Sequence, residues 1–271
     1  MNQEQQAFRE SEDALADLVD VMRRLRDPKE GCPWDLEQTF RTIIPYTLEE
    51  AYEVADAIER NNLEDLKEEL GDLLLQVMFH SQMAKDAGVF DIEDVARGIV
   101  RKMVRRHPHV FSDADIRTAD AQTAAWETEK ARERDAKLAA DKPASAMDGV
   151  AAALPSLVRA EKLQNRAART GFEWTEIKDV IDKLNEEVGE VLAAETTQAL
   201  EEEIGDVLFV AANLARVSGV DPEAALRAAN AKFEQRFRKM EKLAEAMETS
   251  FSNLTLAEQQ SLWRQIKKPS L

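Results

Sequence analysis

Residues 186–206 read EEVGEVLAAETTQALEEEIGD, and this stretch is the best guide to the fold class. Two acidic motifs, Glu186-Glu187-x-x-Glu190 and Glu203-x-x-Asp206, lie on either side of a short break. Apolar residues recur at three- and four-residue spacing around both motifs, which is typical of amphipathic helices. Because the break is short, we expect two helices, at about 176–194 and 198–218, that pack antiparallel in an all-α fold with bundle packing.

The acidic side chains of this hairpin are candidates for metal ligands. Glu187 and Glu203 interrupt the apolar stripes of their helices, and Asp206 lies one turn beyond Glu203, so the three carboxylates would converge on a semi-buried spot. Such carboxylates need either raised pKa values or a cation, and oxygen ligands favour Mg²⁺ or Mn²⁺. One Cys and three His disfavour a closed zinc site, and the absence of a Glu-x-x-His motif disfavours a ferritin-like di-iron site. An ordinary solvated acidic face is the alternative.

The first half of the chain repeats this pattern. Residues 49–72 read EEAYEVADAIERNNLEDLKEELGD, and GCPWD at 31–35 matches GFEWT at 171–175. A repeated arrangement favours function over a chance run of acidic residues. We therefore expect two copies of one domain, at 1–140 and 141–271. The linker would be the stretch 137–155, which is rich in small residues and contains proline.

Local signals predict where the other helices begin and end. Thr47-x-x-Glu50 resembles a capping box, which would start a helix at Leu48 that runs to about residue 60 and breaks at Asn61. The next helix would span about 63–87, with Gly88 as its stop. Asp91 and Asp221 are predicted N-caps of the following helices, the second of which would span about 222–248.

Basic and aromatic residues recur downstream of both hairpins. The second half has Lys232 with Arg236 and Trp263 with Lys267, each pair four residues apart, and the first half repeats these pairs as Lys102 with Arg106 and Trp126 with Lys130. The recurrence favours phosphate binding by the cations of the second copy and stacking on a base by Trp263, although packing explains Trp263 equally well. Lys183, one turn before Glu187, replaces Tyr46 of the first copy and is the clearest chemical difference between the halves.

Composition narrows the partners and the setting. The chain has 271 residues, with 53 Asp and Glu against 36 Lys and Arg, and its net charge of −17 argues against general binding to nucleic acid polymers. No apolar run is long enough to span a bilayer, and the first residues do not resemble a secretory signal, so no membrane association is expected. Cys32 is the only cysteine, which excludes an intramolecular disulfide and favours a cytoplasmic location.

Several segments together resemble the MazG-type nucleoside triphosphate pyrophosphohydrolases of the all-α NTP pyrophosphohydrolase superfamily. These segments are GCPWDLEQT, YTLEEAYEVADAI at 46–58, KEELGDLLLQVMFH at 67–80, RRHPHVF at 105–111 and LEEEIGD at 200–206. The resemblance implies hydrolysis of NTPs, and often dNTPs, to the monophosphate and pyrophosphate, with Mg²⁺ and as a homodimer.

The resemblance also implies roles for individual residues and different roles for the two copies. It implies that the second copy is catalytic and the first structural or less active. It implies that the metal is bound by Glu187, Glu190, Glu203 and Asp206. It implies that the nucleotide is contacted by Lys183, Glu186, Lys232, Arg236, Trp263 and Lys267. Glu186 is also a candidate to orient or deprotonate the attacking water. Glu50, Glu53, Glu69 and Asp72 leave a second metal site in the first copy possible.

Two other functions remain open from the sequence. One is a catalytically silent helical homodimer that binds a partner protein. The other is a pyrophosphohydrolase restricted to one modified or deoxy nucleotide. The sequence identifies neither the base and sugar preference nor a regulatory protein partner.

Overall fold

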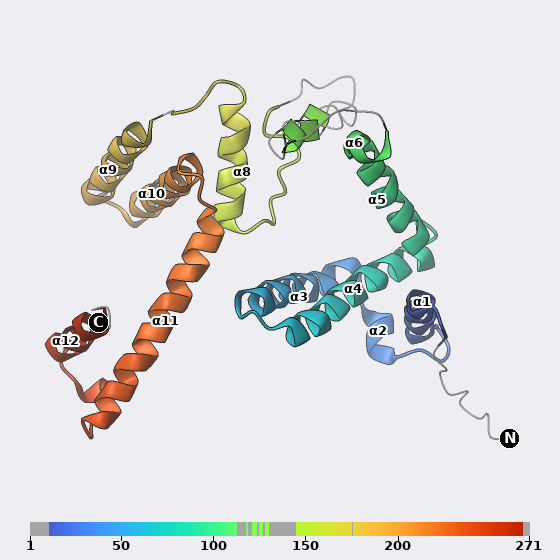
Figure 1. The fold of residues 1–271 in the computed structure, drawn as a ribbon, viewed down its shortest axis with the longest axis horizontal. Coiled ribbons are helices and arrows are strands. Elements are labelled where there is room, and N and C mark those ends of the chain that lie inside the picture. Colours follow the sequence, from blue (N-terminus) through green and yellow to red (C-terminus); the bar gives the residue numbers. More distant parts are fainter. Residues whose placement is uncertain are drawn as a thin grey trace. The chain divides into compact units, whose positions relative to one another are not determined.

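The protein is all-α and divides into two compact units, Met1–Glu129 and Lys130–Leu271 (Figure 1). The computed structural model describes residues 11–112, 118, 121–123, 125–126, 128–129, 145–174 and 176–267. Within these ranges the secondary structure is helical and contains no β-strand, which confirms the predicted fold class. The predicted domain boundary at 140–141 lies outside the described residues, as does the linker up to residue 144, so both stay predictions.

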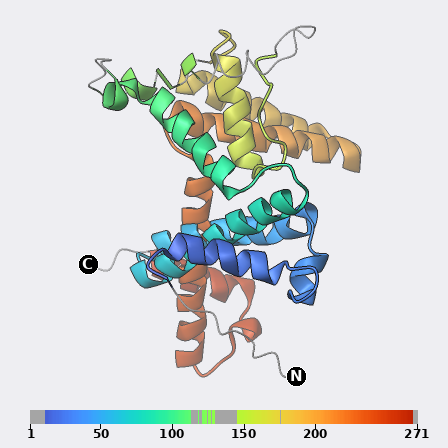
Figure 2. The same ribbon diagram turned by 90° about the vertical axis from the view of Figure 1, so that its right-hand side faces the viewer.

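The first unit is built around a hairpin of two long helices, α3 and α4, which lie side by side in both ribbon views (Figures 1 and 2). Helix α1 packs on α4, and α5 follows α4 after a tight turn. The elements of this unit are α1 (Ala14–Leu25), α2 (Pro33–Glu37), α3 (Phe40–Glu59), α4 (Leu63–Asp86), α5 (Ile92–Arg106) and α6 (Pro108–Phe111).

Helix α3 begins eight residues earlier than the sequence predicted. Its N-cap is Thr39, which forms a reciprocal capping box with Thr42, so the predicted capping box at Thr47 is wrong. Thr47 lies inside the helix, where its hydroxyl donates to the carbonyl of Ile43 at 3.2 Å. Pro45 is also accommodated inside α3, at the loss of one backbone hydrogen bond.

The other predicted helix ends in this unit are confirmed. Asn61 adopts a positive φ of 54°, and Asn62 caps α4. Gly88 ends α4 with φ of 68°, a left-handed conformation that favours glycine. Asp91 caps α5 through the amides of Glu93 and Asp94.

The second unit repeats the hairpin with α9 and α10, and α8 packs against α10. The predicted N-cap Asp221 is confirmed, and Gly219 ends α10 with φ of 69°, as Gly88 ends α4. The long helix α11 then carries α12 near its far end (Figure 1). The elements are α8 (Ser156–Ala168), α9 (Ile177–Ala193), α10 (Thr197–Val217), α11 (Pro222–Ala246), the 3₁₀ turn η1 (Phe251–Asn253) and α12 (Leu256–Lys267).

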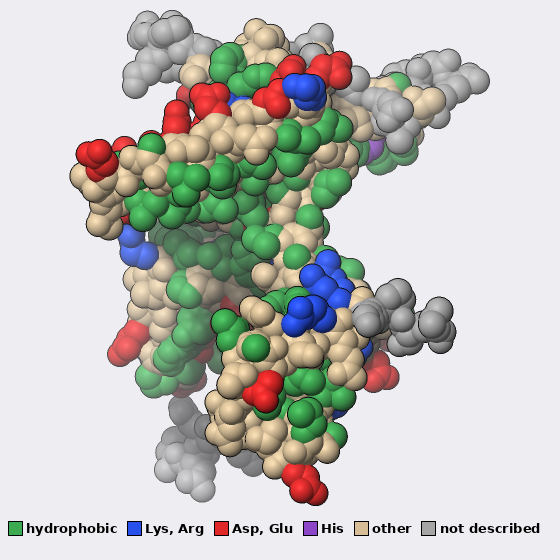
Figure 3. Space-filling model, turned by 90° about the vertical axis from the view of Figure 1, so that its left-hand side faces the viewer, with side chains coloured by type: hydrophobic (Ala, Val, Ile, Leu, Met, Phe, Trp, Pro, Cys, Tyr) green, Lys and Arg blue, Asp and Glu red, His purple; other side chains and the backbone are tan. Residues whose placement is uncertain are grey.

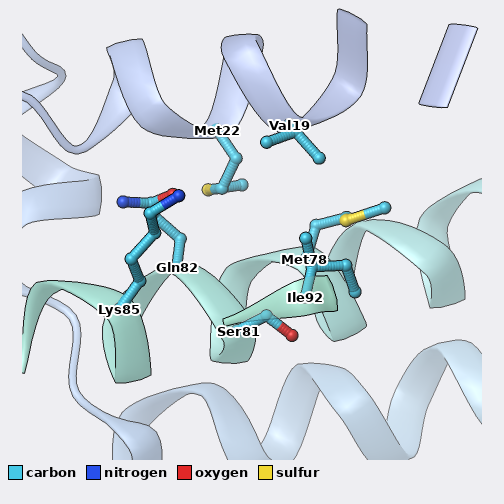
Figure 4. Close-up of a pocket in the computed structure, with 7 residues that line it drawn as sticks. All are labelled: Val19, Met22, Met78, Ser81, Gln82, Lys85 and Ile92. Carbon is cyan, nitrogen blue, oxygen red and sulfur yellow. The ribbon is translucent and has the colours of Figure 1, made fainter. Parts of the chain in front are cut away.

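The core of the first unit lies where α1 crosses α4. Met22 of α1 is almost fully buried, and it packs with Met78, Phe79 and Met83 of α4. Figure 4 shows Met22 and Val19 pointing from α1 toward Met78. The cavity between them measures only about 10 Å³, which leaves no room for a ligand and identifies this contact as packed core.

None of the described helices combines the length and apolar character needed to cross a bilayer. The cytoplasmic location stays a prediction.

Candidate functional site

The α9–α10 hairpin brings three of the predicted metal ligands together. Glu187 of α9 and Glu203 and Asp206 of α10 each offer a carboxylate oxygen, and these oxygens lie within 4.8 Å of one another. Glu187 is 5% exposed, because the apolar stripe that it interrupts carries it toward the hairpin interface. Three carboxylate oxygens at this spacing, one of them buried, fit a hard divalent cation of the Mg²⁺ class.

The charge on this cluster is partly compensated by Lys183. Its ammonium lies 2.8 Å from a carboxylate oxygen of Glu186 and 2.8 Å from one of Glu187. The hydrogen bonds to these two carboxylates, that to Glu186 first, raise the pKa of Lys183 above its ordinary value. Lys183 therefore stays protonated beside the acidic cluster, where it can also donate to an anionic group.

Glu190 lies one turn after Glu187 on the same helix. Partial desolvation is the main cause that raises its pKa, followed by a hydrogen bond with Glu187 and repulsion from Glu187 and Glu203. The carboxylate of Glu190 thus experiences the field of the cluster, although it is not among the three oxygens that lie within 4.8 Å. A divalent cation would remove the repulsion that raises this pKa.

The first unit assembles the same cluster from Glu50, Glu69 and Asp72, whose oxygens also lie within 4.8 Å of one another. Desolvation, followed by repulsion from Asp72 and Glu53, raises the pKa of Glu50. Desolvation, followed by repulsion from Glu53 and Asp72, raises that of Glu69. The repeat inferred from the sequence therefore extends to the geometry of the carboxylates.

A cavity of about 480 Å³ lies behind the acidic cluster of the second unit. Glu187, Asp206 and Lys183 line its polar side. The aromatic rings of Phe172 and Trp174, which meet edge to face at 5.9 Å, line another side. The volume falls within the range of about 300–1,000 Å³ that is typical of small-molecule sites.

Sequence reasoning missed the polar residues at the back of this cavity. Asn213 is 3% exposed and Gln164 is 8% exposed. Arg216 connects Asn213 to the loop before α9, because its Nε donates to Asn213 Oδ1 at 2.9 Å and its Nη1 donates to Glu173 at 2.8 Å. The available signal for Asn213 was an amide within the mostly apolar stretch VLFVAANLARV at 207–217.

The predicted basic and aromatic residues form a separate group on α11 and α12. The Arg236 guanidinium lies 5.7 Å from the centre of the Trp263 ring, and the Lys267 ammonium lies 5.4 Å from it. Phe233 packs on the same ring at 5.6 Å. Lys232 is exposed one turn before Arg236. Figure 3 shows Lys and Arg side chains gathered on this part of the unit.

No described contact joins this group to the carboxylates of the α9–α10 hairpin. The structure brings Arg236 and Lys267 to Trp263, but it does not bring these three to Glu187 within one chain. In the first unit Trp126 has a packing role, since its Nε1 donates to the carbonyl of Arg106 at 3.0 Å, and Lys130 lies outside the described residues.

Comparison with known proteins identifies the family. The family model of the MazG nucleotide pyrophosphohydrolase domain matches residues 38–111 and 175–240, which contain both acidic clusters. The chain is 47% identical over 259 residues to an Escherichia coli K12 protein named nucleoside triphosphate pyrophosphohydrolase, covering 94% of this chain and 97% of that protein. It is 41% identical to a Thermotoga maritima protein named nucleoside triphosphate pyrophosphohydrolase/pyrophosphatase MazG, covering 93% and 94%.

These matches confirm the resemblance inferred from the sequence. Because the family model occurs twice and the relatives are matched along almost their whole length, the tandem arrangement is part of the match. The chain belongs to the family of MazG nucleotide pyrophosphohydrolases.

Proposed function

We propose that this enzyme hydrolyses nucleoside triphosphates, deoxy forms included, to the monophosphate and pyrophosphate with the help of Mg²⁺, for which Mn²⁺ can substitute. The observation that carries the proposal is the gathering of Glu187, Glu203 and Asp206 within 4.8 Å beside a cavity of about 480 Å³. The names of the relatives support the same activity.

We assign the holding of the divalent cation to Glu187, Glu190, Glu203 and Asp206. When bound, such a cation supplies neutralisation of negative charge on the phosphate oxygens. Lys183 donates from the edge of the cluster to a phosphate oxygen, in place of its present bond to Glu186. While Lys183 exchanges Glu186 for the phosphate, its ammonium stays in place because it keeps the 2.8 Å contact with the buried Glu187.

We assign the role of general base to Glu186. Its carboxylate is exposed and lies at the edge of the cluster, bonded to Lys183, so its oxygen can accept a proton from a water beside the α-phosphorus. The water oxygen then forms the new bond to the α-phosphorus as the bond to the bridging oxygen of the pyrophosphate breaks. The products are the nucleoside monophosphate and pyrophosphate.

We further propose that Lys232, Arg236, Trp263 and Lys267 bind the nucleotide. The support is their mutual arrangement, in which two cations flank one indole ring and Lys232 lies exposed one turn away. An anionic group placed beside this ring would meet both cations at once. The test compares the KM for an NTP in two variants, Arg236→Ala and Arg238→Ala. Arg238 is an exposed arginine on the same helix that pairs with Glu234, so only Arg236→Ala should raise the KM.

We also propose that the protein is a homodimer through its hairpins. Large apolar side chains are exposed on both helices of the second hairpin, among them Ile181, Val188, Ile204 and Leu208. Figure 3 shows hydrophobic side chains gathered on an exposed face of this part of the molecule. A second copy would bury this surface. Analytical ultracentrifugation should show a dimer that Ile204→Glu weakens, and a monomeric native protein would contradict the proposal.

The decisive experiment is a product assay across NTPs and dNTPs with and without Mg²⁺. We expect metal-dependent formation of monophosphate and pyrophosphate. Release of diphosphate and phosphate would contradict the proposed site of attack. Failure to release pyrophosphate from any nucleotide would favour a silent interaction module, and hydrolysis of a single nucleotide would favour the narrower enzyme.

A further inference from the structure

The two units differ at one buried position behind the acidic cluster. Phe79 is the seventh residue after Asp72 on α4, and Asn213 is the seventh residue after Asp206 on α10. Both side chains are buried, at 4% and 3% exposure. The same position of the same helix therefore faces inward in both units, but it carries a large ring in one and a small amide in the other.

In the first unit the ring of Phe79 is buried against an aromatic and a cationic side chain. It packs edge to face with Trp34 at 6.4 Å, and the Arg26 guanidinium lies 5.7 Å from its centre. In the second unit Trp174 matches Trp34 in sequence, since each follows a glycine by three residues, and Trp174 lines the cavity of about 480 Å³ together with Asn213. The exchange of a phenyl ring for an amide thus accompanies an open cavity next to the carboxylates.

The back of this cavity offers one buried acceptor without a partner. Gln164 Nε2 donates to the carbonyl of Phe209 at 2.7 Å, which fixes the orientation of the amide. Gln164 Oε1 is then buried and has no hydrogen-bond partner. A buried acceptor without a partner is costly to maintain, so a ligand that donates to it would be bound favourably.

Asn213 supplies the complementary group. Its Oδ1 accepts from Arg216 Nε at 2.9 Å, so the amide that remains for a ligand is the Nδ2 donor. The cavity is therefore lined by an acceptor, Gln164 Oε1, by a donor, Asn213 Nδ2, and by two aromatic rings. This combination suits a flat heterocycle with a hydrogen-bonding edge.

We infer that the cavity lined by Trp174, Gln164 and Asn213 receives the nucleobase of the substrate, and that Asn213 is the residue that opens it. This inference rests on the proposed function. The apolar walls formed by Leu163, Phe172 and Val210 exclude the triphosphate from the cavity, and the adjoining Lys183 and Asp206 place the triphosphate at its mouth.

The paired amides also explain how one cavity accepts several bases. Each of the common bases presents a donor next to an acceptor on its Watson–Crick edge, and Gln164 Oε1 with Asn213 Nδ2 can satisfy such a pair in each case. The base is then held here instead of on Trp263, whose ring is already flanked by Arg236 and Lys267. The structure thereby assigns the base to a site other than the one that the sequence suggested.

The test replaces Asn213 by the residue of the first unit. Asn213→Phe should lower kcat/KM for ATP and CTP at least about tenfold by closing the cavity. The matched control is Arg238→Phe, which adds the same ring at an exposed position of α11 that does not line the cavity, and which should leave both values within about twofold. Circular dichroism and thermal melting check that both variants fold.

A second variant tests the hydrogen bond by itself. Gln164→Met keeps the side-chain length and should raise the KM for ATP about two- to tenfold with kcat retained, the loss expected for one hydrogen bond. With purine riboside triphosphate, which lacks the exocyclic amino group of adenine, the same variant should lose less. An equal loss with both nucleotides would assign Gln164 a packing role.

Base-free and phosphate-free ligands separate this inference from the proposed function. Ribose 5-triphosphate should be a poor substrate that Gln164→Met does not worsen further, and adenosine should inhibit ATP hydrolysis competitively, with weaker inhibition in Asn213→Phe. If ATP is hydrolysed but Asn213→Phe keeps the native KM, the base pocket is wrong and the function stands. If no nucleotide is hydrolysed but calorimetry shows that adenosine binds to the native protein and not to Asn213→Phe, the function is wrong and the pocket stands.

Discussion

The two units carry the same carboxylate cluster on the same helical hairpin, yet the buried residue seven positions after the last carboxylate is a phenyl ring in one and an amide that lines a cavity in the other. In the first unit Phe79 is 4% exposed and packs edge to face against Trp34 at 6.4 Å. In the second unit Asn213 lines a cavity of about 480 Å³. We therefore predict that the duplicated carboxylates alone do not make the first unit a substrate site, because a substrate also needs a cavity beside them.

The largest expected effect concerns stability and tests whether Phe79 is core. Phe79→Ala should lower the free energy of unfolding by about 3–5 kcal/mol, because it removes a buried ring and leaves a void. Asn213→Ala, the matched change in the second unit, should lower it by only about 0.5–1.5 kcal/mol, the value of one hydrogen bond. Urea denaturation followed by circular dichroism measures both, and equal losses would remove the contrast between the units.

The second prediction compares the two acidic clusters directly. Glu203→Gln should lower kcat for NTP hydrolysis by more than about 100-fold, because even residues one shell away from a metal typically cost 10–100-fold. Glu69→Gln, the equivalent change in the first unit, should leave kcat within about twofold of the native value. A steady-state pyrophosphate assay distinguishes the outcomes, and a comparable loss in Glu69→Gln would show that the first unit is active as well.

The carboxylate clusters were predictable from the sequence because their geometry is local. Helical periodicity places Glu187 and Glu203 on the faces that meet in a hairpin, and a short turn makes the hairpin antiparallel. The stop at Gly88 was predictable for a similar reason, since a positive φ is a property of one residue.

The cavity was not predictable, because it depends on side chains from helices that are distant in the sequence. Gln164 on α8 and Asn213 on α10 come together only through tertiary packing. The start of α3 was mispredicted because two threonines, Thr39 and Thr47, could both cap a helix, and Pro45 suggested a boundary that packing overrides. Local signals cannot decide between two such caps.

The third prediction concerns Lys183, because Tyr46 occupies the matching position of the first unit. Lys183→Met should lower kcat/KM by about 10–100-fold, the loss expected for a hydrogen bond to a charged group worth about 1.5–3 kcal/mol. Tyr46→Met at the matching position should have no effect on kcat/KM, because Tyr46 packs edge to face on Trp34 at 5.8 Å. Equal losses in both variants would remove Lys183 from the list of substrate-binding residues.

The smallest expected effect is a pH dependence of stability that arises in the first unit. His80 is half-buried, with its ring parallel to that of Phe40 and its Nε2 3.1 Å from the Thr47 hydroxyl. Burial lowers the pKa of His80 below the value of about 6.5 that the unfolded chain has. Between these two pKa values the unfolded state binds more protons, so stability is full above about pH 6.5 and falls as the pH decreases through this window.

The second unit offers the matched residue for this test. Leu214 is the eighth residue after Asp206, as His80 is the eighth after Asp72. His80→Leu should therefore flatten the dependence of Tm on pH below about 6.5 relative to the native protein. Melting curves between pH 5 and pH 8 measure it, with Gln82→Leu on the same helix as a control that keeps the histidine and removes no titratable group. An unchanged slope in His80→Leu would mean that the carboxylates, whose pKa values lie lower, account for the acid sensitivity of both units alike.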